Sequence, residues 1–159
     1  MSSKPERSEF DSVDPAPPSG VIRISELRQT LCDEDERMFQ RMRALFALRN
    51  IGGSDSVDAL VAAFTSNSAL LKHEIAYVLG QMQDSHAVVP LIERLRDLDE
   101  DLMVRHEAAE ALGAIGNQDA IPVLKEFVDD DEPVISESCE VALDLLAWVR
   151  NDRLDYAEL

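Results

Sequence analysis

Two pairs of adjacent residues have side chains that commonly bind metals. Glu74 follows His73, and Glu107 follows His106. Neutral imidazole and carboxylate are ligands of non-haem iron, and two histidines with one carboxylate form a facial triad that leaves positions open for oxygen. Zinc is the main alternative, because it accepts the same ligand types. The two pairs therefore indicate a metal site that holds iron or zinc.

Several other chemistries are disfavoured by the same sequence. Neither pair belongs to the HExxH motif of zinc proteases, because Tyr77 and Glu110 stand where the second histidine would be. The chain also has no glycine-rich phosphate loop and no nucleophile elbow. Cys139 occupies an alanine-like position in a helical pattern, so we expect it to be buried packing and not a nucleophile.

The two pairs occupy matching positions of an internal repeat. Its four aligned segments, offset by 31, 33 and 31 residues, are 42–48, 73–79, 106–112 and 137–143. Second helices of the repeat are expected at 57–64, 88–98 and 121–128. A two-helix unit that recurs at this period cannot bury its apolar face alone, so successive units must stack. The predicted fold is all-α, a short HEAT-like solenoid of about four helix pairs.

Helical periodicity predicts where the two histidines point. At about 100° per residue, the apolar positions of each helix fall opposite its histidine. These positions are Leu71, Ile75, Val78 and Met82 for His73, and Val104, Ala108, Ala111 and Ile115 for His106. Both histidines should therefore face away from the core.

Two glycines return to the side of the helix that carries the histidine. Gly80 and Gly113 each follow a histidine by seven residues, whereas the other two repeats have Arg49 and Asp144 there. Glycine inside a helix costs roughly 0.5 to 1 kcal/mol relative to alanine. We therefore expect another backbone, a metal or a substrate to approach closely at both glycines.

Composition limits the partners and the compartment. Fifteen basic against thirty-two acidic residues give a net charge of −17, which excludes the basic face that nucleic acid requires. The two cysteines do not form a disulfide framework, so a reducing cytoplasm is expected. No apolar run reaches the ~20 residues that span a bilayer.

Residues 1–20, rich in Ser, Pro, Glu and Asp, are expected to form a disordered linker-like segment before a repeat domain at 21–159.

The segments around the two pairs resemble a known enzyme family. Residues 68–83 and 103–115 are similar to the paired motifs of deoxyhypusine hydroxylase. This resemblance implies a HEAT-like di-iron monooxygenase with two Fe(2+) ions in each complete active site. Its implied partner is eukaryotic translation initiation factor 5A, whose deoxyhypusine side chain the family hydroxylates to form hypusine.

The resemblance also implies individual roles. His73, His106 and Glu107 would bind iron, and Glu74 would have a catalytic role by holding the amino groups of the substrate. Helix geometry alone does not separate the two glutamates. The alternative function is a non-catalytic HEAT-like scaffold that binds a protein partner or a structural metal.

The ends of the chain resemble particular parts of that family. Residues 11–18 are similar to the linker between its two halves, and residues 137–144 to the close of its C-terminal half. The resemblance therefore implies that this chain corresponds to the C-terminal half. An N-terminal half or an identical chain would then complete the di-iron site.

Overall fold

The computed structural model describes residues 4–151, which contain eight α-helices and no strand. This content confirms the predicted all-α class and the expected number of helix pairs. The chain divides into two compact units, Met1–Asn67 and Ser68–Leu159. None of the helices in the described residues is both long enough and apolar enough to cross a membrane.

From residue 4 onward, the first unit contains three α-helices and one 3₁₀ turn. They are α1 (Ile24–Cys32), α2 (Met38–Ile51), α3 (Ser54–Ala62) and the turn η1 (Ala63–Thr65). Helix α1 packs against both α2 and α3 around fully buried leucines such as Leu31, Leu45 and Leu60. Gly52 and Gly53, at φ 71° and 82°, make the turn between α2 and α3 in a region that favours glycine.

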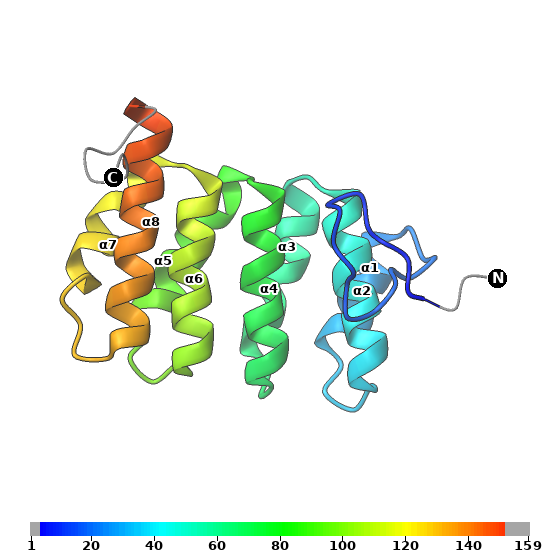
Figure 1. Ribbon diagram of the computed structural model, residues 1–159. Helices are drawn as coiled ribbons and strands as arrows, with labels where there is room; N and C mark the ends of the chain where they lie inside the picture. The colour runs from blue at the N-terminus through cyan, green and yellow to red at the C-terminus, as the bar shows by residue number, and fades with distance from the viewer. Residues whose placement is uncertain (1–3, 152–159) are drawn as a thin grey trace. The chain divides into compact units, whose positions relative to one another are not determined.

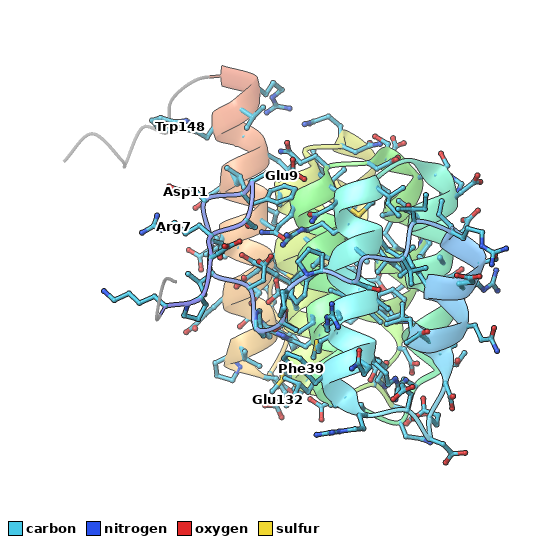
Figure 2. The ribbon with its side chains drawn as sticks, turned by 90° about the vertical axis from the view of Figure 1, so that its right-hand side faces the viewer. Arg7, Glu9, Asp11, Phe39, Glu132 and Trp148 are labelled. Atoms are coloured by element: carbon cyan, nitrogen blue, oxygen red, sulfur yellow. The ribbon has the colours of Figure 1, made fainter. Side chains whose placement is uncertain are left out.

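In the N-terminal segment of this unit, the described residues 4–23 form no helix, but they are packed. Asp14 pairs with Arg49 at 2.6 Å, and the two side chains are 8% and 0% exposed. The guanidinium of Arg49 also lies 4.5 Å from the ring centroid of Phe10. Arg7 and Asp11, labelled in Figure 2, form an exposed ion pair of 2.7 Å in the same segment. The buried Arg49 thus gives Asp14 of this segment a specific partner within the unit.

The second unit, as far as residue 151, contains five α-helices and two 3₁₀ turns. They are α4 (Ala69–Met82), η2 (Ser85–Ala87), α5 (Val88–Arg96), α6 (Leu102–Ile115), η3 (Gln118–Ala120), α7 (Ile121–Phe127) and α8 (Pro133–Asn151). Helices α4, α6 and α8 stand side by side, and α5 and α7 pack against α6 and α8 from behind (Figure 1). The unit is thus a row of first helices backed by a row of second helices.

Local sequence sets the ends of the two helices that carry the His-Glu pairs. The side chain of Ser68 accepts a hydrogen bond from the backbone N–H of Leu71 at the start of α4. The side chain of Asp101 accepts one from Met103 at the start of α6. Such caps satisfy backbone donors that have no partner within the helix. The residues that follow the two helices, Gln83 and Gly116, are both in the left-handed conformation that is common after a helix.

The predicted core stripes of α4 and α6 are largely confirmed. Leu71, Ile75 and Val78 are fully buried on α4, and Val104 and Ala108 on α6. Only the last predicted position of each stripe, Met82 or Ile115, is partly exposed. Because these stripes are buried, the opposite sides of α4 and α6 carry the His-Glu pairs.

The two helical glycines lie where neighbouring first helices approach most closely. A Cβ atom placed on Gly80 would lie 3.1 Å from the Cα of Ala111 on α6, and one on Gly113 would lie 2.9 Å from the Cα of Ala142 on α8. Of the three expected neighbours, the one found is therefore another backbone. This close packing of α4, α6 and α8 brings side chains of adjacent helices within reach of one another.

Candidate metal centre

The residue before each histidine fixes the rotation of its helix. Lys72 Nζ pairs with the buried carboxylate of Glu100 at 2.6 Å, which ties α4 to the loop before α6. Arg105 is 4% exposed, and its Nε donates to the carbonyl oxygen of Leu95 at 3.0 Å, which ties α6 to α5. Lys72 thus points toward the loop before α6 and Arg105 toward α5, and the histidines that follow them point along the outer face.

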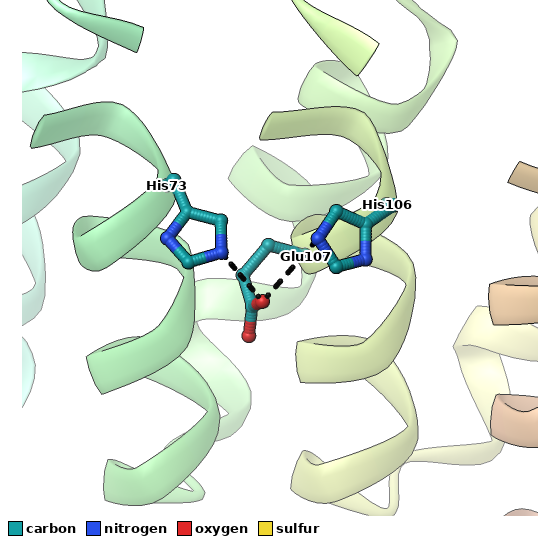
Figure 3. Close-up of side chains that lie close together, drawn as sticks. All are labelled: His73, His106 and Glu107. Atoms are coloured by element: carbon teal, nitrogen blue, oxygen red, sulfur yellow. Dashed lines mark ion pairs between the residues drawn. The ribbon is translucent and has the colours of Figure 1, made fainter. Parts of the chain in front are cut away.

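The structure brings His73, His106 and Glu107 together on this face (Figure 3). The Oε2 atom of Glu107 lies 3.0 Å from His73 Nε2 and 3.8 Å from His106 Nε2. One ligand atom from each of the three residues lies within 4.8 Å of the other two. Two imidazole nitrogens and one carboxylate oxygen thus converge on a single point.

This donor set fits a bound iron. Two histidine nitrogens and one carboxylate oxygen are the ligands of the facial triad, which leaves further positions open. The two imidazole rings are 5.7 Å apart between centroids and inclined by 34°, so they are not stacked on each other. Their side chains are about one-fifth exposed, which leaves the site accessible from outside.

Electrostatics at Glu107 also favour a cation. Burial, together with the nearby carboxylates of Glu110 and Glu74, raises the pKa of Glu107 to about 7, and His106 opposes this rise. Without a cation, the carboxylate therefore holds a proton up to nearly neutral pH. A divalent ion would offset the repulsion among these acids and would stabilise the ionised form.

Glu74 lies beside the three-residue cluster and is not a member of it. Its Oε1 atom is 3.8 Å from His73 Nδ1, the ring nitrogen on the side away from Glu107. This His73 Nδ1 atom is buried and makes no hydrogen bond among the described residues. The two glutamates, which helix periodicity left equivalent, thus occupy different positions relative to the histidines.

A cavity of about 490 Å³ opens next to Glu107 in the second unit. Its lining includes Tyr77, Gly80, Glu110, Val141 and Leu145. The lining therefore combines acidic groups with apolar side chains. This combination suits a ligand with an aliphatic body and a cationic group.

Sequence reasoning missed two residues at the site, Glu110 and Ser138. Glu110 Oε1 lies 3.6 Å from His106 Nδ1, and Ser138 Oγ lies 3.4 Å from the same nitrogen. The spacing of His106 and Glu110, four residues apart on one helix, could have indicated the first contact. Ser138 could have been found because it aligns with Glu107 in the repeat, but its residue type gave no signal.

Two further residues with reactive side chains lie outside the cluster. His86 is exposed in the turn η2. Cys139 is fully buried, and burial raises the pKa of its thiol to about 11. A buried, protonated thiol fits the predicted packing role, because thiolates and not thiols are nucleophiles.

Comparisons with known proteins agree with this architecture. The HEAT-repeat family matches residues 63–144, more than half of the chain, and the PBS lyase HEAT-like repeat matches residues 40–66. The solved structure of human deoxyhypusine hydroxylase in complex with glycerol superposes with a TM-score of 0.87 at 46% identity, covering 91% of this chain and 50% of that one.

Curated relatives point the same way. The chain is 51% identical over 147 residues to deoxyhypusine hydroxylase-B of Oryza sativa, covering 92% of this chain and 49% of the relative. It is 44% identical over 155 residues to the human deoxyhypusine hydroxylase, covering 98% of this chain and 51% of the relative. The chain therefore spans about half the length of the relatives it matches. It belongs to the HEAT-repeat family, and nearly all of it resembles about half of a deoxyhypusine hydroxylase.

Proposed function

We propose that this chain provides one iron-binding half of a deoxyhypusine hydroxylase and corresponds to the C-terminal half of its relatives. The observation that carries the proposal is the convergence of His73, His106 and Glu107 in a chain this similar to those enzymes. In this proposal the Nε2 atoms of both histidines and Oε2 of Glu107 hold one Fe(2+) ion. The bound metal supplies oxygen activation for hydroxylation of the substrate.

The proposed substrate is the deoxyhypusine side chain of eukaryotic translation initiation factor 5A. Glu74, next to the cluster but outside it, is the proposed partner of an ammonium group of that side chain. The cavity beside Glu107 would take the aliphatic part of the same side chain. A net charge of −17 favours the approach of such a cationic group.

We propose that a second set of ligands completes a two-iron site. The cluster on this chain offers one triad, whereas two irons with facial ligand sets need two. The relatives are about twice as long as the matched region, so they have room for a second half. In this protein the second set would come from an N-terminal half or from an identical chain related by a two-fold axis.

The cytoplasm is the proposed compartment. Both cysteines of the chain are free thiols, which suits a reducing environment. A translation factor as substrate requires the same location.

The decisive experiment is a hydroxylation assay of the reconstituted site. The iron-loaded chain would be incubated in air with a reductant and deoxyhypusine-containing factor 5A, alone and with the N-terminal half of a full-length relative. Mass spectrometry should detect the gain of one oxygen atom on the factor, and His73→Ala should abolish this gain. If the assembled, iron-loaded complex gives no product, the enzyme proposal is wrong and the chain is a metal-binding scaffold.

A further inference from the structure

The two ring nitrogens of His106 face different groups. Its Nε2 atom lies 3.8 Å from Glu107 Oε2, and its Nδ1 atom lies 3.4 Å from Ser138 Oγ. A neutral imidazole carries a proton on one nitrogen and a lone pair on the other. Metal binding through Nε2 therefore requires the proton to be on Nδ1. The group that accepts a hydrogen bond from Nδ1–H therefore determines whether His106 is in the tautomer that binds a metal through Nε2.

Ser138 is arranged as an acceptor toward His106. Its hydroxyl lies 2.7 Å from the carbonyl oxygen of Val134, one turn earlier in α8, and 3.5 Å from Glu110 Oε1. The much shorter contact makes the Val134 carbonyl the acceptor of its only hydrogen. The lone pairs of Oγ then remain for His106 Nδ1. Ser138 is only 5% exposed, so water has little access to compete for this contact. Glu110 Oε1 stands 3.6 Å from the same Nδ1 atom as a second, more exposed acceptor.

The contact follows the register of the repeat. Glu107 of one first helix reaches His73 on the preceding first helix. Ser138 on α8 aligns with Glu107 and likewise reaches His106 on the preceding first helix, α6. In both cases, the residue at the repeat position of Glu107 contacts the histidine of the preceding first helix. The last helix, which lacks a His-Glu pair, has a small acceptor there in place of a metal ligand.

We propose that Ser138 is a positioning residue for the metal centre. It accepts a hydrogen bond from Nδ1–H of His106, and this contact directs the lone pair on Nε2 toward Glu107 and His73. The inference rests on the proposed metal-binding function of His106. It adds α8, which contributes no ligand, to the elements that set the geometry of the site.

The first test measures the tautomer of His106 in the metal-free protein. Nitrogen-15 NMR at a pH where the ring is neutral distinguishes the Nδ1–H from the Nε2–H form, and His106→Ala assigns the signals. The wild-type protein should show the Nδ1–H form. Ser138→Ala should shift the population toward Nε2–H, and Ser138→Thr, which keeps the hydroxyl, should restore it. A wild-type ring in the Nε2–H form would overturn the proposal, even if no variant folded.

The second test measures metal affinity with cobalt(II) as the probe. Loss of a partner that orients a ligating histidine typically weakens metal binding about 10- to 100-fold. Ser138→Ala should show a loss in this range. Ser136→Ala is the matched control, because Ser136 is in the same helix and its hydroxyl donates to the carbonyl of Pro133. This control should keep wild-type affinity.

The two tests separate this inference from the function on which it rests. Unchanged cobalt affinity and an unchanged tautomer in a folded Ser138→Ala protein would refute the positioning role alone. A wild-type protein that binds no cobalt would instead refute the proposed metal centre, while the tautomer measurement would still decide whether Ser138 orients His106.

Discussion

Glu107 reaches from α6 to His73 on α4, with 3.0 Å between its Oε2 atom and the Nε2 atom of the ring. The contact depends on the close packing of the two helices, because Gly80 lets the backbone of Ala111 approach it. The same carboxylate oxygen also faces His106 Nε2. A single glutamate thus links two repeats and makes one site from two histidines that are 33 residues apart in the sequence.

The different positions of Glu74 and Glu107 predict that their substitutions weaken different functions, substrate binding and iron binding. Glu107→Gln should strongly weaken iron binding, because it removes the charged oxygen that both histidines face. Glu74→Gln should retain iron and weaken binding of the cationic substrate, since a charge-assisted hydrogen bond contributes about 1.5 to 3 kcal/mol. Metal analysis and substrate titration of the assembled enzyme measure the two effects. Loss of iron in Glu74→Gln with substrate affinity intact would reverse the assignment.

The raised pKa of Glu107 predicts how the stability of the metal-free protein depends on pH. Its pKa is about 7 in the folded chain, against an ordinary value of 4.5, so the folded state binds the proton more tightly. This contribution to stability is complete below about pH 4.5 and is lost as pH rises through 7. Denaturation by urea at several pH values should show less of this decline in Glu107→Gln than in wild type. The exposed Glu137→Gln is the control, and an identical pH dependence in all three proteins would contradict the prediction.

Close helix packing predicts that alanine is unfavourable at both helical glycines. A Cβ on Gly113 would meet the Cα of Ala142 at 2.9 Å, and one on Gly80 would meet that of Ala111 at 3.1 Å. Overpacking typically costs about 1 to 3 kcal/mol, against a gain in helix propensity of roughly 1 kcal/mol. Gly113→Ala should therefore lower the free energy of unfolding, and by more than Gly80→Ala. Gly20→Ala, with no atom within 4 Å of its added Cβ, is the control. Higher stability in Gly113→Ala would contradict this account.

Association with a second half should depend on iron. The face with the metal cluster carries Glu74, Glu107 and Glu110, so two such faces repel each other without a cation. Iron should promote pairing, and His73→Ala should weaken it. Sedimentation with and without ferrous iron, for the chain alone and with an N-terminal half, measures the effect. A chain that remains monomeric with iron bound and still hydroxylates substrate would disprove the need for a second half.

Sequence periodicity predicted the fold and the outward direction of the histidines. The repeat predicted the helices α2, α4, α6 and α8, and the apolar spacing predicted that Leu71 and Val104 are buried. Both features depend on local helical geometry and on burial of one helix face, and the spacing of apolar residues in the sequence indicates both.

The sequence did not separate Glu74 from Glu107, because which carboxylate reaches a histidine depends on the offset between neighbouring helices. The repeat aligns Ser138 with Glu107, but the contact between Ser138 and His106 depends on the same offset between helices. The ion pair between Asp14 and Arg49 links residues 35 positions apart, so composition indicated only a polar segment. Contacts of this kind are set by tertiary packing and not by local pattern.

An anaerobic titration with ferrous iron tests most directly whether His73, His106 and Glu107 together bind one metal ion. The wild-type chain should bind one iron, and His73→Ala and His106→Ala should each lose it with unchanged helix content by circular dichroism. His86→Ala, which changes an exposed histidine outside the cluster, should bind iron like wild type. Full iron binding by a folded His106→Ala protein would contradict the account.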